Sequence, residues 1–481
     1  MTESGIVISS ENYISGVEGF PLTSLNSVVR NSTNNLGLIK KATENGVTIL
    51  HLGKFEVVPG DVFYSHSENL KLPVPELLLS RVVNPLGQAI DEREPIKEDG
   101  KTFDLVLNTV APGINTREEV TEQLETGVMA VDSLLPIAKG QRQLIMGPPR
   151  SAKSYFLIEC ILEHMEKGGY AIMGFIMKTD SEVKQIIEQI KESGNSDKII
   201  FVVGSLNDGS GLISLVPDTC LSLAESLRDQ GENVLVVLDD MGKHAKVLRE
   251  LGLLMNVMPG REAYPGDIFY QHAHLIERAG KFNKDFGGSS ITLFPVIETE
   301  VESYIHLIPS NLMASTDGYL LFSQELRSKG YTPAIDFFIS VTRLGKKTQN
   351  KIFAELSQMA RSLFLEYREV LSFGIFASDL GEKTHQLINT GSKIDELFKQ
   401  ESQVRMTIHT QTLLLGFFFT EFCKAQSLDF IVKNKSKLIS IFEGKTFLDL
   451  LKAPEISSSL ELIKSINDKS PEISKLLETN K

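Results

Sequence analysis

The stretch over residues 143–154, Q-L-I-M-G-P-P-R-S-A-K-S, constrains the fold of this chain more than any other. Its apolar residues 144–146 predict a buried strand that ends at Gly147, and an apolar-rich helical pattern begins near Lys153. A strand, a tight loop and a helix with Lys-Ser at the junction form the layout of a phosphate-binding loop. In that layout Lys153 reaches the outer phosphates of a nucleotide, and the Ser154 hydroxyl suits Mg²⁺.

One position of this loop departs from the pattern G-x-x-x-x-G-K-[ST], because Ala152 stands where the pattern has glycine. A Cβ atom there limits how closely the backbone wraps a phosphate, and it excludes conformations that only glycine tolerates. The alternative interpretation is a strand-to-helix turn that binds nothing. If the loop does bind nucleotide, the expected contacts come from Gly147, Arg150, Ser151, Ala152, Lys153 and Ser154.

Length and charge bound the possible classes of protein. The 481 residues suit two or three domains, and 42% hydrophobic with 23% charged residues is typical of a globular protein with true cores. The net charge of −13 argues against general binding to nucleic acid or to an anionic membrane surface. We therefore expect no nucleic-acid partner.

The cysteines and the N-terminus indicate a cytosolic location. Cys160, Cys220 and Cys423 lie far apart without metal-ligand spacing, so we expect reduced and mostly buried thiols. No basic segment followed by an apolar core opens the chain, so no signal peptide is expected. The most apolar run, residues 413–419, is too short to span a bilayer.

The pattern of apolar residues changes twice along the chain. Residues 1–90 carry short apolar runs between Asn, Gly and Pro turns, which predicts an N-terminal β-barrel. Residues 91–345 begin with a polar connector and then alternate strand-like and helical runs, which predicts an α/β domain with a mostly parallel sheet. Residues 346–481 show helical periods, which predicts a C-terminal helical domain. The expected strands of the sheet are residues 144–146, 171–177, 199–203, 234–238, 291–296 and 319–322.

Two carboxylates end one of these expected strands, at Asp239 and Asp240. After a phosphate-binding loop, this is the place where an Asp holds water on Mg²⁺. The alternative is an Asp that only caps the following helix. Hydrolysis also needs a carboxylate that orients water. The strand after the loop helix instead ends near Met177, with no acid before Asp180.

Three further features have weaker signals. His272 and His274 lie two residues apart in a helical pattern, so they do not share a face and a metal site is not expected. Residues 259–267, P-G-R-E-A-Y-P-G-D, contain too many turn formers for a helix and suit an interface loop or an ordinary connector. Arg343 follows a strand-like run over residues 337–341, and a lone Arg is uninformative by itself.

Several ordered motifs closely resemble one family, the alpha subunits of the rotary F-type ATP synthases and ATPases. The similarity runs from the barrel to about residue 405 and weakens afterwards. The matching segments are residues 81–91, 111–114, 126–137, 260–267, 277–279, 295–299, 315–318, 333–335, 340–345 and 367–370. The resemblance implies a β-barrel, a RecA-like P-loop nucleotide-binding domain and a C-terminal helical bundle. It also implies a ring in which this subunit alternates with beta-type catalytic subunits around a gamma-type central stalk.

The resemblance favours alpha over beta because of residues 211–220, the Asp239-Asp240 pair and Met177, which stands where alpha has Gln and beta its catalytic Glu. It implies that Lys153, Ser154 and Asp239 hold Mg²⁺ with ATP or ADP at a non-catalytic site. It also implies that Arg343 is an arginine finger in the neighbouring beta site, within proton-coupled ATP synthesis or hydrolysis. The complex would lie in the cytoplasm, peripheral to the inner face of the cell membrane.

The chain also departs from the alpha pattern. Ala152 replaces the loop glycine, residues 148–150 replace Asp-Arg-Gln, Thr332 replaces an Arg beside the base, and His274 replaces another Arg, while Gln400 keeps an adenine-pocket position. Barrel-like sequence starts near residue 5, so the segment that contacts the peripheral stalk is expected to be missing.

These departures leave other functions open. One alternative is an alpha-like paralog in a motor that drives another machine, such as one for motility. A second is a structural ring subunit that no longer binds nucleotide. A third, an independent nucleoside triphosphatase of the helicase type, is disfavoured by the acidic charge and the missing carboxylate.

Overall fold

A computed structural model describes residues 3–43, 46–97, 100–107, 109–194, 196–299, 304–373, 382–401, 404–452 and 456–479. The chain forms two compact units. The first unit comprises residues 1–119, 139–149 and 164–319, and the second comprises residues 120–138, 150–163 and 320–481.

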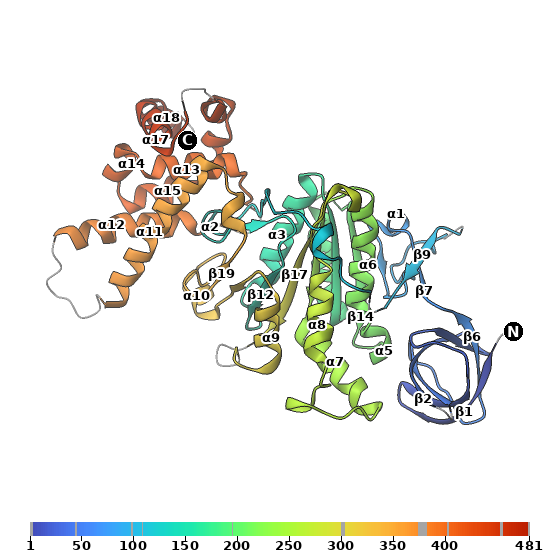
Figure 1. Ribbon diagram of the computed structural model, residues 1–481. Coiled ribbons are helices and arrows are strands. Elements are labelled where there is room, and N and C mark those ends of the chain that lie inside the picture. The colour runs from blue at the N-terminus through green and yellow to red at the C-terminus, as the bar shows by residue number, and fades with distance from the viewer. Residues whose placement is uncertain are drawn as a thin grey trace. The chain divides into compact units, whose positions relative to one another are not determined.

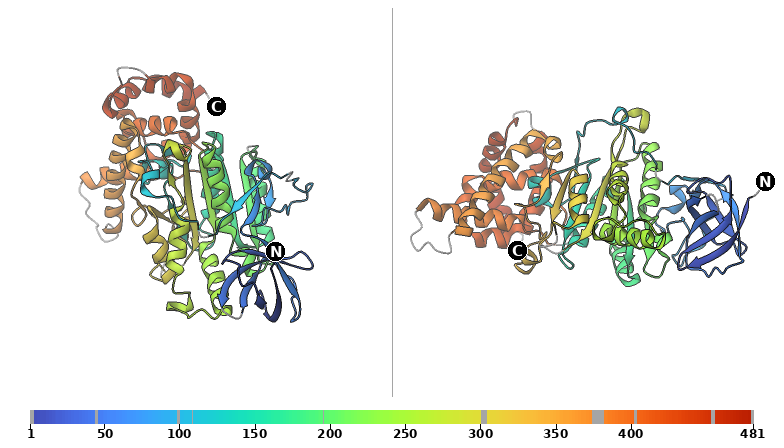
Figure 2. Two further views of the ribbon diagram at one scale, coloured as in Figure 1. Left: turned by 45° about the vertical axis from the view of Figure 1, so that its right-hand side comes forward. Right: turned by 60° about the horizontal axis from the view of Figure 1, so that its bottom comes forward.

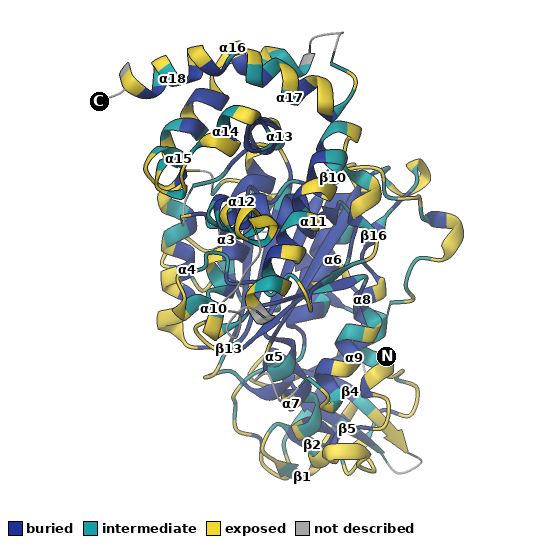
Figure 3. Cartoon of the chain, turned by 90° about the vertical axis from the view of Figure 1, so that its left-hand side faces the viewer, coloured by how far each residue is buried: buried dark blue, intermediate teal, exposed yellow. Residues whose placement is uncertain are grey.

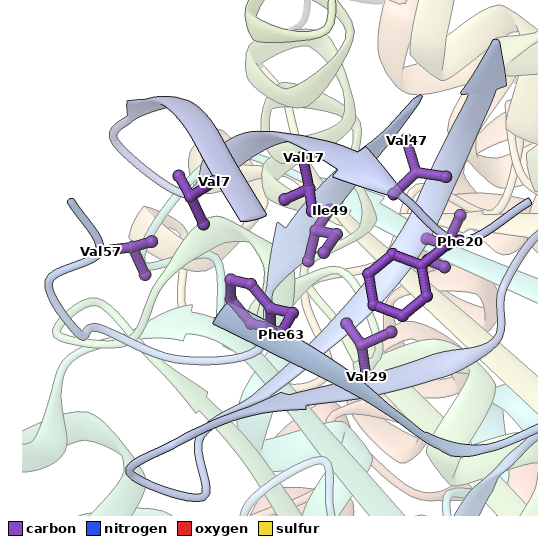
Figure 4. Close-up of a cluster of buried hydrophobic side chains, with 9 residues drawn as sticks. Val7, Val17, Phe20, Val29, Val47, Ile49, Val57 and Phe63 are labelled. Atoms are coloured by element: carbon purple, nitrogen blue, oxygen red, sulfur yellow. The ribbon is translucent and has the colours of Figure 1, made fainter. Parts of the chain in front are cut away.

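The first six strands of the first unit close into a barrel, which confirms the predicted N-terminal fold (Figure 1). In order around the barrel these strands are β1 (Ser4–Glu11), β2 (Ile14–Gly19), β5 (Gly46–His51), β4 (Leu36–Thr43), β3 (Val28–Asn31) and β6 (Val62–Ser67). Alternate side chains of the strands point inward and, together with Phe20 and Val57 from the connecting segments, form one apolar cluster (Figure 4). The cluster consists of Val7, Val17, Phe20, Val29, Ile39, Val47, Ile49, Val57 and Phe63.

The predicted connector after the barrel holds more structure than its polar composition indicates. Strand β9 (Thr102–Leu105) pairs antiparallel with β7 (Leu70–Pro73), and Leu105 is buried. Helix α1 (Pro75–Leu78) and strand β8 (Val82–Val83) lie between them in the chain. The expectation of a plain connector was therefore wrong here, because one apolar face of a short strand is enough for pairing.

A parallel sheet forms the centre of the first unit. Its strands lie side by side in the order β12 (Gln143–Gly147), β17 (Ser290–Glu298), β15 (Val234–Asp239), β13 (Tyr170–Lys178), β14 (Ile199–Ser205) and β8. Each neighbouring pair is parallel, and the short β16 (Gly280–Lys281) adds to β17 in the antiparallel sense. Nearly every residue of β15 and β17 is buried, as expected for strands covered on both faces.

Helices alternate with the strands of this sheet, as the pattern of residues 91–345 predicts. They are α4 (Asp180–Glu192), α5 (Ser210–Ile213), α6 (Val216–Asp229), α7 (Met241–Leu254), α8 (Ile268–Glu277) and α9 (Leu307–Ser315). Helix α6 packs on β13, β14 and β15, while α7 packs on β13 and β17. Figure 2 shows these helices alongside the strands from two further directions.

The second unit is mainly helical, as predicted. Its helices beyond residue 320 are α10 (Gln324–Ser328), α11 (Lys351–Phe373), α12 (Glu382–Phe398), α13 (Ile408–Phe418), α14 (Glu421–Ala425), α15 (Leu428–Glu443), α16 (Lys445–Leu448), α17 (Ser459–Asp468) and α18 (Ser470–Thr479). Figure 3 shows exposed residues on the outer faces of α12 and α15 and buried residues along α13. Among the described residues, no helix is both long enough and apolar enough to cross a bilayer.

One predicted strand of the second unit is wrong. Residues 337–339 form a turn, and the strand β19 covers only Val341–Thr342. The Asp336 carboxylate accepts hydrogen bonds from the backbone N–H groups of Phe338 and Ile339. This side-chain capping of the backbone competes with strand formation despite the apolar sequence.

Candidate functional site

The predicted phosphate-binding loop has the expected strand, turn and helix. Strand β12 ends at Gly147, and α3 (Lys153–Glu166) begins at Lys153. Within the turn, Arg150 has a φ of 61° and Ala152 a φ of 70°, both in the left-handed region. The backbone at Ala152 thus has a conformation that glycine adopts without strain. Alanine adopts it at a cost of about 1–2 kcal/mol.

The side chains of this loop differ in their exposure. Ser151 and Lys153 are buried, whereas Arg150 is exposed. The Lys153 Nζ donates to Ser151 Oγ at 3.5 Å, so the ammonium folds back over the loop. Ser154 is half-buried in the first turn of α3, where the N–H groups of a helix terminus favour an anion.

The two carboxylates at the end of β15 have different roles. Asp240 caps α7, because its Oδ1 accepts from the N–H of Lys243 at 2.9 Å. Its Oδ2 accepts from the N–H of Glu298, at the end of β17, at 2.6 Å. Burial, with a smaller contribution from neighbouring Asp239, raises the pKa of Asp240 to about 6. The helix-capping alternative therefore describes Asp240, and Asp239 remains the candidate for ordering water on a metal.

The sheet brings Asp239 to the edge where the phosphate-binding loop starts. In the parallel register, Gly147 of β12 is opposite Glu298 of β17, and Val296 of β17 is opposite Asp239 of β15. The carboxyl ends of these three strands therefore share one edge, the usual place for ligands in an α/β sheet.

Lys178, the last residue of β13, was not among the predicted site residues. Its Nζ lies 3.2 Å from Oδ2 of Asp239 and 3.7 Å from Oε1 of Glu298. The Lys178 side chain is only 7% exposed and that of Asp239 only 3%. Burial acts to lower the pKa of Lys178, but Asp239 and Glu298 outweigh it and raise the pKa above its ordinary value. A Lys that closes a run of apolar strand residues was the available signal.

The backbone at Met177, where β13 carries no carboxylate, is also unusual. Met177 has a φ of 52° and marks an irregularity in the pairing of β13 with β14. Its carbonyl accepts from the Lys243 Nζ at 2.9 Å. The nearest acid along the chain, Asp180, begins α4 and accepts from Ser205 Oγ at 3.2 Å. The end of β13, at the carboxyl edge of the sheet, therefore carries the thioether of Met177.

Gln400, the predicted adenine-pocket residue, lines a small apolar cavity of about 30 Å³ in the second unit, together with Ala152, Tyr155, Phe156, Thr332 and Pro333. Its Oε1 accepts from the N–H of Met129 at 3.0 Å, and its Nε2 donates to the carbonyls of Gly127 and Val404. The amide therefore fixes the backbone around the cavity.

Arg343 is exposed directly after β19, and its neighbours are anchored within the second unit. The Thr342 hydroxyl donates to the carbonyl of Pro136 at 2.7 Å. A Cβ atom added at Gly345 would lie 1.7 Å from that same carbonyl oxygen, so only glycine fits there. The backbone on both sides of Arg343 is held in place while its side chain is exposed.

The histidine pair lies on α8, as predicted. His272 is buried with its ring centroid 5.7 Å from that of His244, whereas His274 packs against Tyr270. Within the described ranges, no group of three His, Cys, Asp or Glu side chains is arranged to hold a metal ion.

Comparison with known proteins agrees with this architecture. Residues 127–342 match the nucleotide-binding domain of the ATP synthase alpha/beta family, and residues 349–479 match the C-terminal domain of the ATP synthase alpha/beta chain. The chain is 36% identical to ATP synthase subunit alpha of Mycoplasmopsis synoviae, over 86% of this chain and 78% of the relative. It is 34% identical to that of Mycoplasma pneumoniae (96% and 89%) and 34% identical to that of Clostridium acetobutylicum (97% and 93%).

Proposed function

Because the chain belongs to the alpha subunits of the F-type ATP synthases, part of an ATP synthase enzyme complex, we propose that it binds a nucleotide at a non-catalytic site of its own and serves a neighbouring catalytic site through Arg343. The observation that carries this proposal is a loop that starts at Gly147, at the carboxyl edge of a sheet with Met177 in place of a carboxylate, and that continues along the chain to Lys153 and Ser154 at the start of a helix. Such a site holds phosphates and lacks the group that would activate water.

The residues fit a magnesium nucleotide. Loop N–H groups and Lys153 would hold the phosphates, and the cation would offset part of their negative charge. The Ser154 hydroxyl and the Asp239 carboxylate offer the oxygen ligands that Mg²⁺ prefers, the second through water. Gln400 would shape the base pocket through its backbone hydrogen bonds.

The proposed assembly follows from the family. The chain would alternate with beta-type catalytic subunits around a gamma-type stalk, at the cytoplasmic face of the cell membrane, in proton-coupled ATP synthesis or hydrolysis. Its domains would be the barrel at residues 1–90, the nucleotide-binding domain at 91–345 and the helical domain at 346–481.

Equilibrium binding of ATP to the full chain in the presence of Mg²⁺ tests the proposed site. The wild type should bind, and Lys153→Ala should weaken binding by about 10- to 100-fold, because a charge-assisted hydrogen bond to phosphate contributes about 1.5–3 kcal/mol. Lys184→Ala, which removes an exposed lysine of α4, is the matched control and should bind like the wild type.

A wild-type chain that binds no nucleotide would instead identify a structural ring subunit. Equal affinity of Lys153→Ala and the wild type would show that nucleotide binds elsewhere on the chain.

A further inference from the structure

A polar cavity of about 450 Å³ lies within the second unit, and its described lining residues include none of those proposed to bind the nucleotide. Its walls come from the end of α2 (Met129–Leu134), the turn η5 (Gly345–Thr348) and one face of α11. The lining residues Lys346 and Gln358 are exposed, so the cavity opens to solvent. Its volume suits a small organic ligand, since ligand pockets typically span about 300–1,000 Å³.

Two cations face this cavity without a balancing anion. Lys346 and Arg361 both line it, and none of its described lining residues carries a carboxylate. Neither cation forms an ion pair within the part of the chain that the structure describes. The carboxyl group of Asp132, on α2, accepts instead from Thr126 and Gln411. Partial burial and the Arg361 guanidinium lower the pKa of Lys346, so an anion that binds to both cations would relieve their repulsion.

Capping of α2 accounts for only part of this arrangement. Arg361 Nη1 donates to the carbonyl of Leu134 at 3.2 Å, and Gln349 Nε2 donates to the carbonyls of Asp132 and Ser133 at 2.9 and 3.2 Å. These carbonyls at the end of α2 are therefore satisfied before any ligand binds. A guanidinium has five N–H donors, and the bond to Leu134 occupies one of them.

A buried hydroxyl in the same wall has no hydrogen-bond partner. Ser357 of α11 lines the cavity, is 3% exposed, and its Oγ is without a partner among the described residues. A serine inside a helix can bond to the carbonyl four residues earlier, but Ser357 does not. Because an unpaired buried hydroxyl is unfavourable, such a group calls for an explanation. A ligand oxygen would supply the missing acceptor.

We propose that this cavity binds an organic phosphate, with its phosphoryl group contacting Lys346 and Arg361. A phosphate ester carries close to two negative charges at neutral pH, which matches the two cations, and its three oxygens accept several hydrogen bonds. A carboxylate carries one charge and would leave one cation uncompensated. The apolar lining residues Leu134, Ala354 and Leu365 cover the organic part of the ligand. This inference does not rest on the proposed function.

Titration calorimetry of the full chain with phenyl phosphate at pH 7.5 tests this site. We expect a Kd on the order of 1 mM or tighter, a modest affinity per atom for so small a ligand. Inorganic phosphate should bind several-fold more weakly because it lacks the apolar ring. Benzoate, which has the ring but one charge, should bind about 10-fold more weakly or worse, since it forgoes a charge-assisted contact.

Variants of the two cations identify the site. Arg361→Gln and Lys346→Gln should each weaken phenyl phosphate binding by about 10-fold or more, because each removes a charge-assisted hydrogen bond. Lys433→Gln, which changes an exposed lysine of α15, is the matched control and should bind like the wild type. Lys153→Ala should also keep its affinity for phenyl phosphate, and Arg361→Gln should keep the wild-type affinity for ATP with Mg²⁺.

Ser357→Ala separates a role in binding from a role in folding. The variant removes a buried hydroxyl that has no partner, so its melting temperature should equal or exceed that of the wild type. Its affinity for phenyl phosphate should nevertheless fall by several-fold. This variant and Lys346→Gln, which changes an exposed side chain, remain decisive if Arg361→Gln does not fold.

Absence of phenyl phosphate binding by the wild type, or wild-type affinity in Lys346→Gln, would overturn the inference. Benzoate binding as tight as that of phenyl phosphate would assign the cavity to carboxylates and so refute the proposed ligand class. Binding that disappears in Lys153→Ala but persists in Lys346→Gln would place the phosphoryl group in the phosphate-binding loop instead. None of these outcomes changes the proposed function, which depends on the affinity for ATP with Mg²⁺.

Discussion

The side-chain amide of Gln411 donates a hydrogen bond of 2.8 Å to Oδ2 of Asp132, a residue 279 positions earlier in the chain. Oδ1 of Asp132 accepts from both the N–H and the hydroxyl of Thr126. The carboxyl group is completely buried, and this burial raises its pKa from 3.8 to about 7 although the three donors act in the opposite direction. Helix α13 and the segment before α2 (Met129–Leu134) are thus joined by a group that titrates near neutral pH.

This pKa predicts how the stability of the chain depends on pH. Between about pH 4 and pH 7 the folded chain keeps a proton on Asp132 that the unfolded chain has released. The free energy of unfolding should therefore fall as the pH rises through this window, by up to about 1.4 kcal/mol per pH unit, and then become level. Asp132→Asn removes the titration, so its stability relative to the wild type should improve by about 1–3 kcal/mol between about pH 5.5 and pH 8.

Denaturant unfolding of both proteins at several pH values measures this difference. Asp267→Asn is a matched control, since the exposed Asp267 carboxylate also accepts from a glutamine amide, that of Gln271. A difference between Asp132→Asn and wild type that stays constant with pH would rule out titration of Asp132 in this range.

The sequence was sufficient for the long strands of the sheet and for the strand, turn and helix around residues 147–153, because these depend on local patterns. Long apolar runs such as residues 234–238 have one stable place, inside a parallel sheet, and Lys-Ser after a tight turn indicates the loop. The strand predicted over residues 337–341 was wrong because the Asp336 carboxylate accepts hydrogen bonds from the N–H groups of Phe338 and Ile339. The apolar pattern of the sequence does not reveal this interaction.

Lys178 was missed for a different reason. Its partners Asp239 and Glu298 lie on two other strands, and only the order β17-β15-β13 brings the three charges together. No spacing along the chain encodes that order. The same holds for Gln400, whose position was recognised from family resemblance but whose hydrogen bonds to the backbone of residues 127 and 129 depend on tertiary packing.

Replacement of Ala152 by glycine should improve the phosphate-binding loop. At a φ of 70°, alanine is strained by about 1–2 kcal/mol, while glycine adopts this conformation freely but costs about 0.5–1 kcal/mol of extra chain entropy. Ala152→Gly should therefore change the melting temperature little. It should tighten ATP binding several-fold, because the backbone can then approach the phosphates more closely.

Ala263 provides the control for this prediction. It also has a left-handed φ, of 61°, but lies between α7 and α8, outside the phosphate-binding loop. Ala263→Gly should affect stability to a similar degree and leave ATP affinity unchanged. Equal or weaker ATP binding by Ala152→Gly would show that the Cβ atom of Ala152 does not limit the site.

The purified chain on its own should hydrolyse ATP at a negligible rate. Met177 offers a thioether where a carboxylate would activate water, and Asp180 is already engaged at the start of α4. Phosphate release by the chain, freed of any beta-type partner, is the measurement. Sustained turnover that disappears in Lys153→Ala would mean that this chain is itself catalytic.

Arg343 should act in a site formed by another chain. Its backbone is fixed by the Thr342 hydrogen bond to Pro136 and by the close packing of Gly345, while its side chain is exposed. Arg suits such a role because its guanidinium stays charged and contacts two phosphate oxygens at once. In the complex assembled with the beta-type subunit, Arg343→Ala should therefore reduce turnover by about 10²-fold or more without preventing assembly or ATP binding. Arg343→Lys should recover little of the loss, since a flexible point charge does not reproduce the planar fork.

Arg30→Ala, a change on the exposed face of β3, should leave turnover unchanged. Turnover of the assembled Arg343→Ala complex within a few-fold of the wild type, or failure of this variant to assemble, would assign Arg343 a structural role instead.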